Sequence, residues 1–189
     1  MFRSTTTSVM PENKWQSLFE FQQTQPEVNQ LSWLSEYGSM TRQLMIAGAS
    51  GVKVEVISAK HQRVAKEERL FLDLPQNNWS YVREVNMSIA NIPWMYGRTV
   101  IPSRTLQGVG GQLKMLGDKP LGKILFSHGN SRKFIEIAKI SETHHLFPTF
   151  EGSDNVKYLW ARRSLFEFKK QPILVQEVFL PNCPLQIPE

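Results

Sequence analysis

The clearest strands are marked by apolar side chains at every second position. In residues 52–56 three valines alternate with charged residues, and in residues 79–89 the odd positions are mostly apolar. A period of two is typical of a strand with one buried face. A turn at residues 91–93 leads into residues 94–101, which we expect to pair with residues 79–89 as a hairpin.

Apolar residues in the N-terminal third are grouped at helical spacing instead, around Trp15 and around Trp33. Ser39 predicts the N-cap of a short helix, which two glycines end. We expect a glycine-weakened helix over residues 104–116 and a short helical piece over residues 119–126.

Three further strands are predicted at residues 134–140, 158–168 and 173–180, with a polar loop at residues 141–157. The order is helices, a strand hairpin, helices and strands, with short turns between neighbouring strands. Short turns imply antiparallel pairing. We therefore predict an α+β fold: a single domain with a central antiparallel sheet and a helical layer on one side.

Length and composition limit the class of protein. A chain of 189 residues fits one domain, and no apolar run is long enough to span a membrane. The net charge of +5 comes from dispersed basic residues, so we expect no nucleic acid partner. Cys183 is the one cysteine, which rules out an intramolecular disulfide and favours the reducing cytoplasm. Residues 1–14 lack the apolar core of a secretory signal, and we expect a disordered tail.

Motifs for metal, nucleotide or covalent chemistry are absent from the sequence. The glycines near residue 110 lack the spacing and the lysine of a phosphate-binding loop. His144 and His145 have neither a nearby cysteine nor a third histidine at ligand spacing, so we predict no metal site. We also predict that the protein uses no cofactor.

Two charged residues break the apolar pattern of their strands. Arg83 falls on the apolar face of residues 79–89, and Glu177 lies in residues 173–180, which are apolar on both faces. A buried charge needs a partner, because burying it alone costs several kcal/mol. The two could pair with each other or with other buried charges, as Glu136 and Arg162 might also do. Alternatively, they line a closed pocket in which Arg83 binds a carboxylate and Glu177 a hydroxyl.

Arg98 is a third candidate for ligand binding. It lies between Tyr96 and Val100 on one face of the second hairpin strand. An exposed hairpin face would explain its position equally well, and the sequence leaves both interpretations open.

Several segments, in this order and spacing, together resemble the chorismate pyruvate-lyase family. They are Ser39-Met40-Thr41, Tyr81-Val82-Arg83-Glu84-Val85, Pro93-Trp94 with Gly97-Arg98-Thr99-Val100-Ile101-Pro102, Lys119-Pro120-Leu121-Gly122, Phe134-Ile135-Glu136-Ile137, Trp160-Ala161-Arg162-Arg163-Ser164 and Glu177-Val178-Phe179-Leu180-Pro181 with Pro184-Leu185.

The resemblance implies a monomer whose ligand is buried beneath helical flaps. It implies conversion of chorismate to 4-hydroxybenzoate and pyruvate, at the entry to the synthesis of ubiquinone or a related quinone. By matched motif, the ligand-contacting residues would be Met40, Arg83, Leu121 and Glu177, with Arg83 and Glu177 as the catalytic pair. Residues 1–25 would form an N-terminal extension, partly disordered or helical, and residues 26–189 the lyase-like domain.

Two other functions remain open. A similar sheet with flaps resembles the effector-sensing domain of some bacterial transcription regulators, which carry an N-terminal winged helix. The residues before position 31 are too few for such a DNA-binding winged-helix domain. The second alternative is a degenerate lyase that binds an aromatic acid without turning it over.

Overall fold

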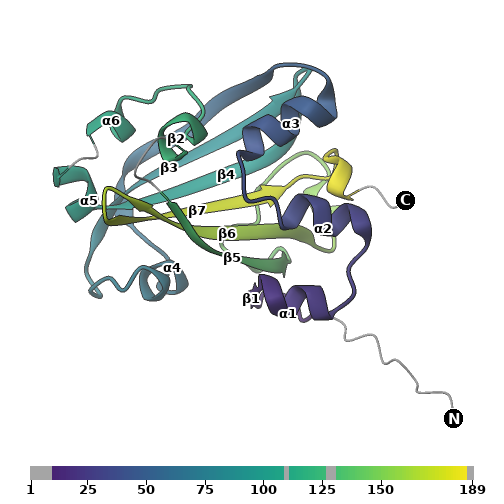
Figure 1. The fold of residues 1–189 in the computed structure, drawn as a ribbon, viewed down its shortest axis with the longest axis horizontal. Helices are drawn as coiled ribbons and strands as arrows, with labels where there is room; N and C mark the ends of the chain where they lie inside the picture. The colour runs from purple at the N-terminus through teal and green to yellow at the C-terminus, as the bar shows by residue number, and fades with distance from the viewer. Residues whose placement is uncertain (1–9, 109–110, 127–130, 187–189) are drawn as a thin grey trace, which may run out of the picture.

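The computed structural model describes residues 10–108, 111–126 and 131–186. These residues contain a seven-stranded antiparallel sheet (Figure 1). In spatial order its strands are β1 (Gln16–Ser17), β5 (Ser131–Ile140), β6 (Leu159–Phe168), β7 (Gln171–Phe179), β4 (Ile92–Pro102), β3 (Trp79–Ile89) and β2 (Val52–Arg63). The α+β prediction with a central antiparallel sheet is confirmed.

The predicted hairpin is formed by β3 and β4, which pair from Ile89 opposite Ile92 to Ser80 opposite Pro102. Trp94 is an extra residue in β4, because Met87 pairs with Met95 whereas Ser88 pairs with Pro93. Because of this β-bulge, the side chains of β4 after Trp94 lie on the opposite face of the sheet from the one they would occupy in a regular hairpin. Strand β2 is longer than the predicted residues 52–56, because the side chains of residues 57–63 are mostly exposed and carry no apolar period.

Most helices lie on one face of the sheet. They are α1 (Leu18–Gln23), α2 (Val28–Leu34), α3 (Met40–Gly48), α5 (Ser103–Gly108), α6 (Gly111–Lys114) and α7 (Gly122–Leu125). Phe21 of α1 packs edge-on against Trp160, and Trp33 of α2 packs edge-on against Phe179. Of the helix predicted over residues 104–116, the structure describes α5 and α6, and residues 109–110 lie outside the described part of the chain.

The opposite face is covered as well, which the predicted helical layer on one side did not include. Helix α4 (Lys66–Phe71) and the residues after it pack on Val82, Val100 and Leu174. The loop at residues 141–157, with a 3-10 turn at Ser153–Asn155, covers the next part of this face. Helices are thus concentrated on one side, as expected, but α4 belongs to the other.

The N-terminal extension is packed onto this domain from residue 10 onward. Met10 is buried, and the Asn13 backbone N–H donates to the Lys139 carbonyl. The disordered tail expected at residues 1–14 is therefore wrong for residues 10–14, while residues 1–9 lie outside the described part. The predicted helical portion is α1, which follows β1 and begins with a capping box between Ser17 and Glu20. None of the helices in the described residues is long and apolar enough to cross a membrane.

Candidate functional site

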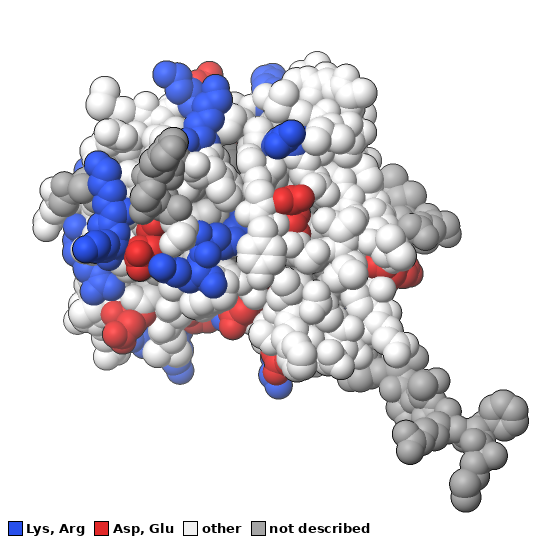
Figure 2. Space-filling model, in the orientation of Figure 1, with Lys and Arg blue, Asp and Glu red and all other residues white. Residues whose placement is uncertain are grey.

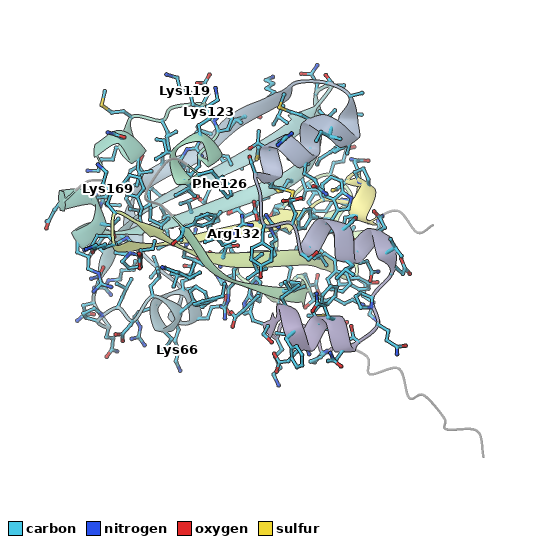
Figure 3. The ribbon with its side chains drawn as sticks, in the orientation of Figure 1. Lys66, Lys119, Lys123, Phe126, Arg132 and Lys169 are labelled. Carbon is cyan, nitrogen blue, oxygen red and sulfur yellow. The ribbon has the colours of Figure 1, made fainter. Side chains whose placement is uncertain are left out.

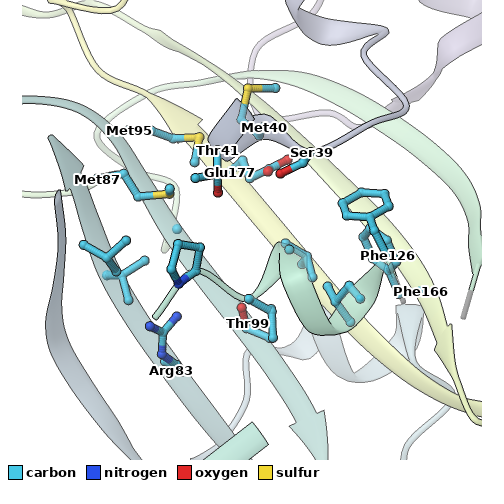
Figure 4. Close-up of a pocket in the computed structure, with 18 of the residues that line it drawn as sticks. Ser39, Met40, Thr41, Arg83, Met87, Met95, Thr99, Phe126, Phe166 and Glu177 are labelled. Carbon is cyan, nitrogen blue, oxygen red and sulfur yellow. The ribbon is translucent and has the colours of Figure 1, made fainter. Parts of the chain in front are cut away.

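A cavity lies on the helix-covered face of the sheet, beneath α3 and α7 (Figure 4). Its empty volume is about 570 Å³, part of which is open to solvent. Met40, Arg83, Leu121 and Glu177, the four residues named by the resemblance, all line it. The wall between them is mainly apolar, which suits an aromatic ligand held by a few polar groups.

Two segments meet over the cavity: residues 39–41 at the start of α3, and residues 120–122 at the start of α7. Their approach is close, because a Cβ added at Gly122 would lie 2.9 Å from the Ser39 Oγ. The Ser39 side chain makes no capping hydrogen bond to α3. The first N–H groups of α3 therefore stay available at the cavity, and such groups bind anions or hydroxyls readily.

Arg83 is nearly fully buried, with 5% of its surface exposed, and lies toward one end of the cavity (Figure 4). Its Nη2 donates to the carbonyls of Gly117 (2.9 Å) and Lys119 (3.2 Å). Among the described residues, none provides a carboxylate within ion-pair distance of it. Burial lowers the pKa of this guanidinium from its ordinary value, opposed by the charges of Tyr81 and Asp118. Arg83 is thus a buried cation, positioned by backbone carbonyls, whose charge is not neutralised.

Glu177 enters the cavity from β7 and is also buried. Its Oε2 accepts from the Nε of Arg162, which is fully buried behind it. Arg162 is fixed in turn by the Glu36 carbonyl, to which its Nη1 donates at 2.7 Å. The Glu177 Oε1 has no hydrogen-bond partner in the part of the chain that the structure describes, and it remains able to accept from a ligand.

Arg83 and Glu177 do not pair with each other. In the sheet register Arg83 is opposite Thr99, and Thr99 is opposite Val175, two residues before Glu177. Two strand spacings and two residues along a strand separate their Cα atoms by about 12 Å. The interpretation that each charge is neutralised by another buried charge thus holds for Glu177, which pairs with Arg162, and fails for Arg83. The space between the two side chains is the cavity itself (Figure 4).

Arg132 also lines the cavity, and the sequence analysis missed it. It lies on β5 opposite Phe166, whereas Phe134 is opposite Leu165, so Lys133 is the extra residue of a bulge. In a regular strand Arg132 would share the face of Phe134 and Glu136, on the other side of the sheet. The alternation of side chains pointed to the wrong face, and the sequence contains no other signal for this bulge.

The structure differs from both interpretations that the sequence left open for Arg98, because this side chain is buried and does not line the cavity. Gly97 and Thr99 line the cavity, so Arg98 between them points to the opposite face. There its Nε and Nη2 donate to Glu68 (2.7 and 3.1 Å), and its Nη1 donates to Glu84 at 2.8 Å. Burial lowers the pKa of Arg98, but these bonds outweigh it and raise that pKa above its ordinary value.

Glu68 itself is fully buried within this second polar cluster. Burial alone would raise its pKa, but hydrogen bonds from His145 and Arg98 outweigh burial and hold the pKa at about 2. The cluster is therefore a charged, internally paired network beneath α4. It stabilises the fold rather than facing the cavity.

The structure brings a third metal-ligating residue, Glu67 of α4, beside His144 and His145. The three ligand atoms lie within 4.8 Å of one another. However, the Nδ1 of His144 accepts from the Leu146 backbone N–H at 3.2 Å. The Nε2 of His144 lies 3.3 Å from the Glu67 Oε1 but forms no hydrogen bond with it. The Glu67 carboxylate also accepts from the Trp15 Nε1 at 3.3 Å, so Glu67 is engaged within the fold, and the absence of a metal site stays a prediction.

Solved structures with a similar fold belong to transcriptional regulators. PhnF from Mycobacterium smegmatis matches with a TM-score of 0.55 and 10% identity, covering 76% of this chain and 64% of that one. The ligand-binding domain of a putative GntR-family regulator from Bordetella bronchiseptica matches with a TM-score of 0.50 and 13% identity, covering 71% and 87%. At such low identity, the likeness concerns the fold alone.

Sequence comparison gives a family as well as a fold. The chain is 36% identical over 159 residues to a probable chorismate pyruvate-lyase of Methylococcus capsulatus, covering 84% of this chain and 98% of the relative. It is 35% identical to the chorismate pyruvate-lyase of Yersinia enterocolitica, covering 81% and 82%. The family model described as chorismate lyase matches residues 10–186. The chain belongs to the chorismate lyase family.

Proposed function

We propose that this protein is a chorismate pyruvate-lyase that converts chorismate to 4-hydroxybenzoate and pyruvate in the cavity beneath α3 and α7. The observation that supports this best is that one apolar cavity has a buried cation without a carboxylate partner, Arg83, on one side and a carboxylate oxygen able to accept, the Oε1 of Glu177, on the other. An aromatic acid with a hydroxyl opposite its carboxylate has matching groups at its two ends.

The reaction is an elimination that balances without an external reactant. The bond between the ring carbon and the ether oxygen of the enolpyruvyl group breaks, and its electrons leave with pyruvate. The hydrogen on the hydroxyl-bearing ring carbon passes to the enolpyruvyl methylene, which becomes the methyl group of pyruvate. The ring becomes aromatic as 4-hydroxybenzoate. No oxidant or reductant is consumed, so we propose that no cofactor takes part.

The protein would accelerate this step by holding one conformation of the substrate and excluding water. Arg83 would bind the ring carboxylate through the donors that Gly117 and Lys119 leave free. Glu177 would accept a hydrogen bond from the ring hydroxyl. This bond would hold in place the ring carbon whose hydrogen is transferred. Met40 and Leu121 would enclose the ring from the two flap segments, with the N–H groups of α3 nearby.

Turnover of chorismate by the purified protein tests the proposal. The assay follows 4-hydroxybenzoate by chromatography and pyruvate by an enzyme-coupled reaction, and the two products should appear in equal amounts. The variant in which both Arg83 and Glu177 are replaced by Ala is the control. Tight binding of 4-hydroxybenzoate without turnover would instead support a sensor or a degenerate lyase, a reading that the regulator-like fold keeps open.

The fate of the product and the state of the protein are further proposals. We propose that 4-hydroxybenzoate supplies the ring of ubiquinone or a related quinone. Cells that lack this protein should then recover quinone when 4-hydroxybenzoate is fed. We also propose a monomer located in the cytoplasm, for which light scattering of the purified protein and fractionation of the cell are the respective tests.

A further inference from the structure

Chorismate carries two carboxylates, and Arg83 accounts for one. If the proposed function holds, a second cationic group must bind the other carboxylate, and the partners of the buried arginines indicate which one. Arg98 and Arg162 bind Glu68 and Glu177, and Arg163 binds Glu136. Arg83 and Arg132, the two arginines that line the cavity, have no carboxylate partner among the residues the structure describes.

The guanidinium of Arg132 is held in place by backbone carbonyls and aromatic rings. Its Nη1 donates to the Glu36 carbonyl at 2.7 Å and its Nη2 to the Gly38 carbonyl at 3.4 Å. Its guanidinium lies over the rings of Phe126 and Phe166, at 5.4 and 4.8 Å from their centres. The aromatic rings and carbonyls restrict its orientation without neutralising its charge. Its Nε is buried and has no hydrogen-bond partner, so it is a donor available for a ligand.

The two free cations lie at opposite sides of the cavity. Across the sheet the order is Arg83 on β3, then β4, then Glu177 on β7, then β6, then Arg132 on β5. Four strand spacings separate the backbones of the two arginines by about 19 Å, and both long side chains reach inward. Figure 3 shows Arg132 near Phe126, and Lys123 and Lys119 beyond Phe126 on the side away from Arg132.

We propose that Arg132 binds the enolpyruvyl carboxylate of chorismate, and so selects the dianionic substrate over its monoanionic aromatic product. Arg83 holds the ring carboxylate, Glu177 holds the hydroxyl, and Arg132 holds the group that leaves as pyruvate. Once the ether bond is broken, only pyruvate interacts with Arg132. The aromatic product is then retained by Arg83 and Glu177 alone.

The electrostatic surroundings favour an anion at this position. Burial and, to a smaller degree, the nearby charge of Arg162 together hold the pKa of Arg132 at about 10, although the charges of Glu177, Glu36 and Tyr37 act in the opposite direction. A carboxylate beside the guanidinium would offset both effects. Lysine and arginine side chains also gather on the side of this face near α5 and α7, whereas the side near α1–α3 is largely neutral (Figure 2). Such a distribution attracts a dianion toward the cavity.

The test compares substrate and product on one variant, Arg132→Gln. Turnover gives kcat and KM for chorismate, and calorimetry gives the Kd of 4-hydroxybenzoate. We expect kcat/KM for chorismate to fall about 100-fold, mostly through KM, because a buried ion pair is lost. The Kd of 4-hydroxybenzoate should stay within about twofold, because the monoanion does not reach Arg132. Arg132→Lys should recover part of the loss, since it keeps the charge without the planar fork.

Lys133→Gln is the matched control. It removes one positive charge from the adjacent residue, whose side chain is 44% exposed and pairs with Glu167 at the surface. This variant should behave like wild type. A structural role for Arg132 would weaken 4-hydroxybenzoate binding and lower the melting temperature together with turnover, and that result would overturn the inference.

Failure of the proposed function is distinguishable from failure of this inference. If the wild type converts no chorismate, the proposed function fails, and calorimetric binding of chorismate to the wild type and to Arg132→Gln decides the inference instead. Equal affinity of both proteins for chorismate, or equal kcat/KM where turnover occurs, would show that Arg132 does not bind the second carboxylate.

Discussion

Replacing Arg83 by Ala probes the centre of the cavity, because this side chain is the buried cation assigned to the ring carboxylate. Arg83 is 5% exposed, and one of its terminal nitrogens is already engaged by the Gly117 and Lys119 carbonyls. The remaining donors would form the bond to the ligand. Stranding a buried carboxylate costs about 2–5 kcal/mol. Since part of the cavity is open to solvent, we expect about 3 kcal/mol, which is roughly a 150-fold weaker affinity.

The assay is calorimetric titration with two ligands, 4-hydroxybenzoate and phenol. Phenol keeps the ring and hydroxyl but has no carboxylate, so its weaker affinity should be unchanged by Arg83→Ala. Arg104→Ala, which removes an exposed arginine from α5, is the control for loss of charge alone. Unchanged affinity of Arg83→Ala for 4-hydroxybenzoate, or equal losses for both ligands, would refute the assignment of Arg83 to the carboxylate.

Three further outcomes follow from the contacts in and around the cavity. Glu177→Gln should bind 4-hydroxybenzoate nearly as well as wild type but should turn over chorismate at least ~10-fold more slowly. It should also lose about 2 kcal/mol of stability in denaturant titrations, because Arg162 loses its carboxylate partner. A wild-type rate would show that Glu177 has a purely structural role. Gly122→Ala should push the Ser39 flap away and speed release of 4-hydroxybenzoate in stopped-flow experiments, whereas a slower release would contradict that contact. The pKa of Glu68 is about 2 in the folded protein, against an ordinary value of 4.5. The ionised carboxylate therefore stabilises the fold by about 3 kcal/mol above pH 4.5. This contribution is lost as the pH falls from 4.5 through 2. Glu68→Gln should flatten the dependence of unfolding free energy on pH over that range, and an equally steep curve would show that other carboxylates dominate acid unfolding.

Two different patterns in the sequence pointed to Arg83 and Glu177. Arg83 falls on the apolar face of an alternating strand, and Glu177 interrupts a run that is apolar on both faces. Arg83 shares its face with Val85 and Met87, and Glu177 with Val175, and all of these line the cavity. An apolar period of two is enough to assign a face when no bulge interrupts the strand. What the period could not provide was the partner of each charge. Glu177 lies opposite Arg162 because the β6–β7 hairpin turns at Lys169 and Lys170, and the predicted strand bounds were not precise enough to give this register.

The sequence left the position of Arg98 undecided and gave no signal for Arg132, and a β-bulge is the reason in both cases. Without the extra residue Trp94 in β4, Arg83 would be opposite Arg98 and the two would share a face. Without the extra residue Lys133 in β5, Arg132 would be opposite Glu167, away from the cavity. Each bulge moves one arginine to the other side of the sheet, and a one-residue insertion of this kind leaves no periodic signal. The bulges therefore decide which arginines face the ligand.

The orientation of 4-hydroxybenzoate in a crystal structure of its complex tests the central claim most directly. The ligand should lie in the cavity beneath α3 and α7 with its carboxylate on the Arg83 guanidinium and its hydroxyl on the Oε1 of Glu177. Arg132 should then make no contact with it. A ligand bound the other way round, with its carboxylate on Arg132 or on the N-terminus of α3, or a ligand outside this cavity, would contradict the assignment of both residues.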